Sequence, residues 1–164
     1  MARIDPLVQL RSDHTQVRDS LLDLIDATGR RDATKSLEIL IRLDKLTGPH
    51  FRFEEESFYP AIAQFFGKEY QEHLLGAHDQ IIRAAKDLAA VLGKGEITPE
   101  EAEQLPAVIR TQVLPHPVEC EGLGLFAERL SKQELDGMAE NFEACRKADV
   151  PLLEWSESIR ARKA

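Results

Sequence analysis

The sequence is poor in cysteine, in clustered β-branched residues and in basic charge. Its two cysteines, Cys120 and Cys145, are too few for a disulfide framework, so we expect a reduced, cytoplasmic chain. No apolar run approaches membrane-spanning length, and we expect neither a secretory signal nor a membrane helix. The formal net charge of −8 argues against nucleic acid as a partner, because a phosphate backbone requires a basic face.

What the sequence does contain favours one helical domain. The 164 residues are 43% hydrophobic and 30% charged, as in a globular chain long enough to bury a core. Apolar residues recur at alternating spacings of three and four, which is typical of helices in a bundle. We therefore predict an all-α fold, an up-down-up-down four-helix bundle over residues 1–148 with a short C-terminal helix, followed by a docking tail at 149–164.

Capping signals set the expected helix boundaries. Asp5-Pro6 begins the first helix, which ends at Gly29, and Asp32 begins the second, which ends at Gly67. The third helix is expected over 68–92. Capping boxes at residues 98–101 and 131–134 begin the fourth helix and the short C-terminal helix.

His50 and Glu54 are the first candidates for a functional site. They are four residues apart, so both lie on one face of a helix, where they can bind a metal together. Pro49 is expected to kink the helix beside them. A carboxylate on a core-facing stripe is costly unless it is paired or bound to metal, which makes Glu54 hard to explain structurally. We expect the adjacent Glu55 and Glu56 to be solvated.

Three further histidines occupy core-facing stripes or lie beside them. His14 and His78 each interrupt an apolar stripe, a position where a single histidine is usually a core residue with a satisfied hydrogen bond. His116 lies on the apolar stripe of the fourth helix, and Glu121 follows it by five residues. Because Pro117 should disturb the helix between them, we expect Glu121 to face the same way as His116.

His73 is the remaining histidine, five residues before His78. A regular helix turns it about 140° away from His78, onto a flank. Gly76 between them offers a place for a π-bulge that would bring both rings to one face. We expect His78 to be the ligand from this helix, with His73 beside the site as a neighbouring group or an occasional metal ligand.

All five histidines fall at one level when the helices alternate in direction. Counted from the shared ends of the helices, the candidates occupy a slab of about eight residues, or ~12 Å at ~1.5 Å per residue. Core packing explains each histidine singly but not the set. Two carboxylates with four or five imidazoles predict a dinuclear site, because a tetrahedral zinc ion would leave several of these groups unused.

The spaced motifs resemble the hemerythrin-like (HHE cation-binding) family over roughly residues 7 to 130. They are His14, His50-x3-Glu54 with the following Tyr59-Pro60, His78, and His116-x4-Glu121. The resemblance implies two iron ions in an oxo- or hydroxo-bridged di-iron centre. Two departures from the best known members are the spacing of His73 and His78, and Glu121 where those members have aspartate.

The resemblance implies a protein that binds or senses dioxygen. We expect Phe51, Phe53, Phe58 and Leu74 to keep the ligand pocket apolar. The alternative is an enzyme that removes peroxide or nitric oxide, or a protein that handles iron, and in that case Cys120 is of interest, although a small buried thiol is the simpler interpretation. An interaction bundle with a vestigial site fits the full ligand set poorly. A ferritin-like oxidase would need Glu-x-x-His pairs on facing helices.

Overall fold

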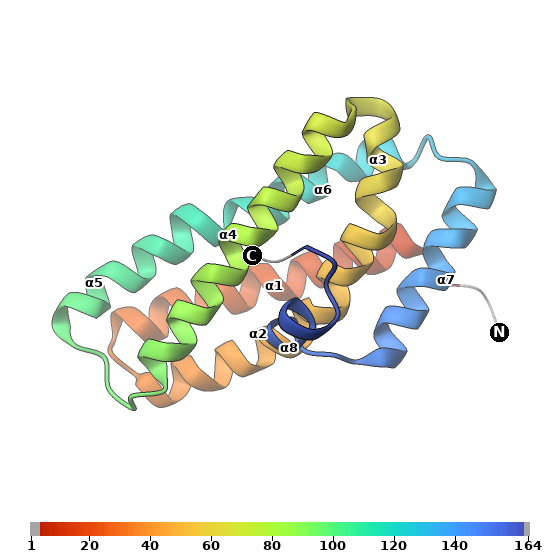
Figure 1. Ribbon diagram of the computed structural model, residues 1–164. Coiled ribbons are helices and arrows are strands. Elements are labelled where there is room, and N and C mark those ends of the chain that lie inside the picture. The colour runs from red at the N-terminus through yellow and green to blue at the C-terminus, as the bar shows by residue number, and fades with distance from the viewer. Residues whose placement is uncertain (1–3, 163–164) are drawn as a thin grey trace.

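The computed structural model describes residues 4–162, and every regular element in this range is helical. The predicted all-α class is therefore confirmed. The long helices lie lengthwise beside one another, and the short α8 lies across one side (Figure 1). The α-helices are α1 (Pro6–Gly29), α2 (Ala33–Phe53), α3 (Tyr59–Phe66), α4 (Lys68–Leu92), α5 (Pro99–Val108), α6 (Pro115–Ala127), α7 (Lys132–Ala148) and α8 (Leu152–Ser158). None of these helices is long and apolar enough to cross a membrane.

The predicted helix starts are confirmed in atomic detail. The Asp5 carboxylate accepts hydrogen bonds from the backbone N–H groups of Leu7 and Val8, at 2.9 and 3.2 Å, and Pro6 is the first helical residue. Complete capping boxes begin α5 at Thr98 and α7 at Ser131. Each box satisfies N–H groups that a helix end otherwise leaves unpaired.

Two single π-helical turns interrupt the long helices, and each ends two residues before a proline. The segment η1 (Glu54–Phe58) ends where the Tyr59 N–H bonds to the Glu54 carbonyl, and Pro60 follows. The segment η2 (Ile109–Val113) ends where the Leu114 N–H bonds to the Ile109 carbonyl at 2.9 Å, and Pro115 follows. Proline has no N–H to donate and crowds the carbonyl four residues earlier, so a wider turn accommodates it.

These two turns are the irregularities nearest the site, whereas α4 is a regular α-helix from Lys68 to Leu92. The alternative of a π-bulge at Gly76 is therefore excluded. Pro49 lies inside α2, which continues to Phe53 before η1 begins.

Two apolar clusters lie on either side of a polar layer. One contains Val17 and Leu43 and occupies the end where α1 meets α2 and α5. The other contains Leu10 and Phe53 and extends to α3, α6 and α7. On α1, His14 falls between the two clusters. The polar layer is thus held between two packed cores that fix the helices on both sides of it.

The segment after α7 docks on α2 and α4. Leu152 and Trp155 of α8 are buried against Phe51 and two isoleucines of α4. The backbone crosses α2 at Gly48, where a Cβ atom would lie 2.0 Å from the Val150 carbonyl oxygen, so only glycine admits this crossing. The division of the chain into residues 1–148 and 149–164 stays a prediction.

Candidate metal centre

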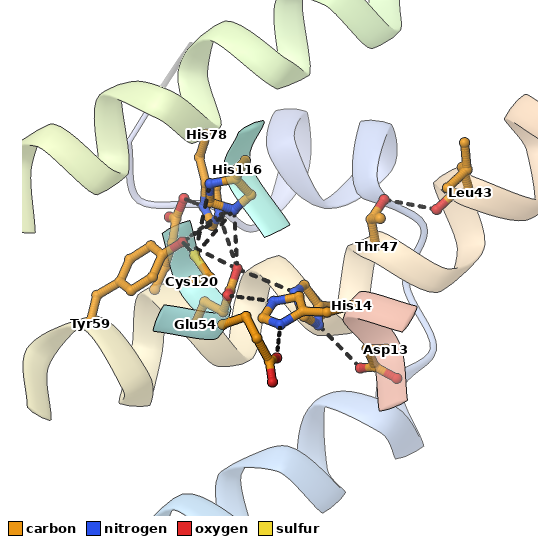
Figure 2. A network of polar contacts seen from close by, with 12 residues as sticks. Asp13, His14, Leu43, Thr47, Glu54, Tyr59, His78, His116 and Cys120 are labelled. Carbon is orange, nitrogen blue, oxygen red and sulfur yellow. Dashed lines mark hydrogen bonds and ion pairs between the residues drawn. The ribbon is translucent and has the colours of Figure 1, made fainter. Parts of the chain in front are cut away.

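Four histidines from four helices surround the carboxylate of Glu54. His14 Nε2 lies 3.5 Å from Glu54 Oε1, and His50 Nε2, His78 Nε2 and His116 Nε2 lie 3.4, 3.1 and 3.6 Å from Glu54 Oε2. All five side chains are buried. Figure 2 shows His14, His78 and His116 around Glu54. We call the four histidines and Glu54 the central cluster. All five were expected from the sequence.

The ligand atoms form two groups that share Glu54. One group is His14, His50 and Glu54, and the other is Glu54, His116 and Cys120; within each group the atoms lie within 4.8 Å of one another. His14 Nε2 and Glu54 Oε1 are buried and have no hydrogen-bond partner among the described residues. Leaving such atoms unpaired is costly. A cation between them would satisfy both atoms, so the donor set fits a metal ion.

Tyr59 places its hydroxyl in the middle of the central cluster. The hydroxyl oxygen lies 3.2 Å from Glu54 Oε2, 2.8 Å from His78 Nε2 and 3.3 Å from Cys120 Sγ. Tyr59 follows Glu54 by five residues, which a regular helix would put on different faces; the π-turn of η1 puts them on one face. In the sequence, Tyr59 stands out only as part of the family pattern. The useful signal was Pro60, which directly follows it.

Three of these histidines have a carboxylate on their other ring nitrogen. The Nδ1–carboxylate pairs are His14 with Glu121 at 3.1 Å, His50 with Asp13 at 3.1 Å, and His78 with Glu55 at 2.8 Å. An ionised carboxylate can only accept, so Nδ1 carries a hydrogen, and whenever the ring is neutral its Nε2 lone pair faces the centre. Metal-binding histidines are commonly oriented in this way.

Each of these three carboxylates is in turn held by an arginine. Arg11 contacts Glu121 at 2.7 Å, Arg146 contacts Asp13, and Arg160 contacts Glu55 at 2.7 Å. The arginine side chains are 77%, 35% and 1% exposed, respectively. The centre therefore has an outer layer of three histidine–carboxylate–arginine chains that differ mainly in burial.

The sequence model of the hemerythrin HHE cation-binding domain matches residues 5–119, well over half of the chain. The chain belongs to this family. No curated protein and no solved structure matched the chain. The HHE match includes every residue of the central cluster and ends just before Cys120. Metal binding at a cluster of histidine and carboxylate side chains follows from membership of this cation-binding family.

The last part of the HHE pattern differs from our expectation. The structure does not bring Glu121 into the central cluster: its side chain is 36% exposed and bonds to Arg11 and to His14 Nδ1. Cys120 takes the inward position, with Sγ 3.6 Å from His116 Nε2. The expected disturbance at Pro117 is wrong, because Pro117 is the third residue of a regular α6, in the first turn, where its missing N–H is tolerated.

The structure also places two other residues that the sequence singled out, and only for Glu55 is the expected position wrong. His73 is 59% exposed and bonds to Glu119 at 3.0 Å, on the flank that a regular helix predicts and outside the central cluster. Glu55, expected in solvent, is only 10% exposed in its side chain, because it lies between His78 and Arg160.

Charge in the metal-free central cluster lies on Glu54 and His50. Burial alone would raise the pKa of this carboxyl, but the surrounding imidazoles, His50 first, hold it well below its usual range. Burial lowers the pKa of His50, yet Glu54 and Asp13 outweigh burial and raise it to about 9. Burial lowers the pKa of His116 to about 4. Burial also raises the pKa of the Cys120 thiol, so sulfur becomes a strong ligand only when a cation displaces its proton.

An apolar cavity adjoins the central cluster. It has a volume of about 140 Å³ and extends from His116 and Phe51 between α1, α2, α4 and η2, with Leu152 and Leu153 forming part of its wall. The Phe51 ring stacks on His78, with ring centroids 3.7 Å apart. Phe51 therefore lines the pocket as expected. Phe53, Phe58 and Leu74 pack instead in the apolar cluster on the other side.

Proposed function

We propose that this chain is a cytoplasmic, non-haem di-iron protein that binds or senses dioxygen. The observation that carries the proposal is the pair of ligand groups that share one buried carboxylate, Glu54. A carboxylate between two cations is the usual bridge in di-iron helical bundles. We also propose that the long helices form the up-down-up-down four-helix bundle predicted from the sequence. The two free, buried cysteines suit a reducing compartment.

The proposed ligands follow the two groups. His14, His50 and Glu54 would hold one ion, and Glu54, His116 and Cys120 would hold the other. His78 would be a further ligand of the second ion, because its Nε2 lies 3.0 Å from His116 Nε2. The Tyr59 hydroxyl lies beside His78 Nε2. Imidazole, carboxylate, thiolate and phenolate are all ligands found on iron. Glu121 is assigned to orienting His14 through Nδ1. When bound, the iron pair would supply the electrons that hold dioxygen.

The cavity supports a small, neutral ligand. Three polar residues line it: Asp44 accepts a hydrogen bond from the Leu153 N–H, the Thr47 hydroxyl donates to the Leu43 carbonyl, and His116 belongs to the central cluster. The rest of the wall is apolar, and an apolar wall disfavours a charged or strongly hydrated molecule. Dioxygen and nitric oxide suit such a space better than peroxide does.

A second function is favoured by a specific pair of residues. The Tyr59 hydroxyl and Cys120 Sγ lie 3.3 Å apart at the centre, and both can donate a proton or an electron to a bound ligand. Such a pair suits an enzyme that consumes peroxide or nitric oxide. The alternative therefore rests on Tyr59 and Cys120, whereas the leading proposal rests on Glu54 and the cavity.

One experiment separates the two functions. Protein loaded with ferrous iron without oxygen is exposed to air, its visible spectrum is recorded, and oxygen is then removed under argon. Reversible binding predicts a spectrum that returns to that of the ferrous protein. Rapid peroxide or nitric oxide consumption that Tyr59→Phe and Cys120→Ser abolish would support the alternative. An iron-loaded protein whose spectrum air leaves unchanged would contradict the dioxygen proposal.

A further inference from the structure

The chain beyond α7 reaches the metal centre through one arginine. Arg160 follows α8, and its side chain is 1% exposed. Two nitrogens of its guanidinium donate hydrogen bonds to the Glu55 carboxylate. Nε lies 3.1 Å from Oε1 and 3.0 Å from Oε2, and Nη2 lies 2.7 Å from Oε1. The remaining nitrogen lies 2.8 Å from Asp79 Oδ1. A buried cation thus joins two acidic side chains of different helices.

Glu55 connects Arg160 to the central cluster. The same oxygen that Arg160 contacts, Oε1, lies 2.8 Å from His78 Nδ1, and His78 Nε2 lies 3.1 Å from Glu54 Oε2. A continuous chain of contacts therefore runs from Arg160 through Glu55 and His78 to Glu54. Without Arg160, Glu55 would be a buried carboxylate with His78 as its only remaining partner among these contacts, and it would gain by turning toward water.

Packing holds Arg160 in this place. Leu152 and Trp155 anchor α8 in the core, and the guanidinium lies over the Trp155 ring, 5.6 Å from its centroid. The Leu153 N–H bonds to Asp44 of α2 at 2.9 Å. The planar five-donor fork of arginine can serve two carboxylates at once, which the point charge of lysine does less well.

The other two arginines of the outer layer provide an internal comparison. Arg11 and Arg146 belong to the same kind of chain. Arg11 is 77% exposed and pairs with a partly exposed carboxylate, and such ion pairs contribute little, whereas Arg146 is 35% exposed and pairs with the buried Asp13. Arg160 alone of the three is shielded from solvent. It also lies outside the HHE match, which ends at residue 119.

We propose that Arg160 is a positioning residue of the metal centre: it holds Glu55 against His78 Nδ1 and so keeps His78 Nε2 directed at the metal. Residues 149–162 are then part of the metal site rather than an appended tail. The inference rests on metal binding at the centre, as proposed above, and not on dioxygen as the ligand.

The test measures the affinity for ferrous iron without oxygen, by competition with a chromophoric chelator. Arg160→Ala should weaken iron binding by about 10- to 100-fold, the usual effect of losing the partner of a metal-binding histidine. Arg160→Lys should recover part of this loss. The matched control is Arg30→Ala, which removes the exposed arginine of a surface ion pair with Asp26, away from the centre, and should stay within about threefold of the wild type.

A double-variant cycle separates positioning from general destabilisation. Glu55→Gln keeps the shape of the side chain and removes its charge, and it also serves if Arg160→Ala does not fold. If Arg160 acts through Glu55, the double variant loses about as much affinity as the worse single variant. The visible spectrum of the air-exposed iron protein should change in the same variants.

Three results decide the matter. The inference is overturned if Arg160→Ala keeps the wild-type iron affinity and an unchanged spectrum. Glu55→Gln takes its place if Arg160→Ala does not fold. The inference is also overturned if the affinity losses of the two single variants simply add in the double variant. Wild-type protein that takes up no iron overturns both this inference and the proposed function. Iron uptake that depends on Arg160 in a protein indifferent to oxygen overturns the dioxygen role alone and supports the inference.

Discussion

Glu54 and Tyr59 lie five residues apart, yet the Tyr59 hydroxyl donates a 3.2 Å hydrogen bond to Glu54 Oε2. A regular helix would turn these side chains about 140° apart. The π-turn before Pro60 removes that difference and brings a phenol into a cluster of imidazoles around one carboxylate. A backbone irregularity thus determines the chemistry of the centre.

Tyr59→Phe tests that phenol. The variant keeps the ring and removes a hydroxyl whose pKa burial raises well above its usual value. We expect the iron content to stay near that of the wild type, because the four imidazoles and Glu54 remain. The visible absorption of the air-exposed iron protein should change, because a phenol oxygen is lost beside the metal. Identical spectra for the two proteins would place the Tyr59 hydroxyl outside the influence of the iron.

Cys120 and Glu121 provide a direct comparison of neighbours. Cys120→Ala should reduce iron binding from about two ions to about one, since it removes a member of the second ligand group. Glu121→Gln should keep both ions with an affinity lowered about tenfold, because it weakens only the Nδ1 partner of His14. Iron analysis of the two purified proteins shows which of the two substitutions removes more iron. A larger loss in Glu121→Gln would restore Glu121 as the ligand.

His78→Ala and His73→Ala make a matched pair on α4. His78 is buried in the central cluster, whereas His73 is largely exposed and bonds to Glu119. We expect His78→Ala to abolish binding of at least one ion, while His73→Ala keeps all of the iron. Isothermal titration with ferrous iron measures both variants. Loss of iron in His73→Ala would mean that this helix rearranges when metal binds.

The stability of the metal-free protein should pass through a maximum near pH 6.5. His50 has a folded-state pKa raised to about 9 by Glu54 and Asp13, against the effect of burial, so its contribution is full below about 6.5 and is lost as pH rises through 9. Burial lowers the pKa of His116 to about 4, so stability falls as pH drops from about 6.5 toward 4. Urea unfolding at several pH values measures the curve. A free energy of unfolding that rises steadily from pH 6.5 to 9 would contradict the environment described for His50.

The central cluster itself was readable in the sequence. His14, His50, Glu54, His78 and His116 interrupt apolar stripes at the level where the helices meet, and helical periodicity alone is enough to bring them together. The helix starts at Asp5 and Thr98 were equally readable, because capping is a local interaction.

What the sequence did not reveal depends on contacts between distant segments. In the sequence, Asp13 and Glu55 are charged residues adjacent to central ligands, and nothing there shows that they are buried. Their partners are far away in the sequence: Arg146 lies in α7 and Arg160 follows α8. The choice between Cys120 and Glu121 depended on whether Pro117 distorts its helix, and that was decided by where α6 begins. The π-turns follow from Pro60 and Pro115 only in combination with the packing around them.

The central claim is that two metal ions share Glu54, and an anaerobic titration with ferrous iron tests it most directly. Wild-type protein should saturate at about two ions per chain, and Glu54→Gln should lose both, because the carboxylate belongs to both ligand groups. Glu56→Gln, which removes a charge from the Arg52 pair at the surface, is the control and should bind as the wild type does. Saturation of the wild type at one ion, or two ions retained in Glu54→Gln, would contradict the shared carboxylate.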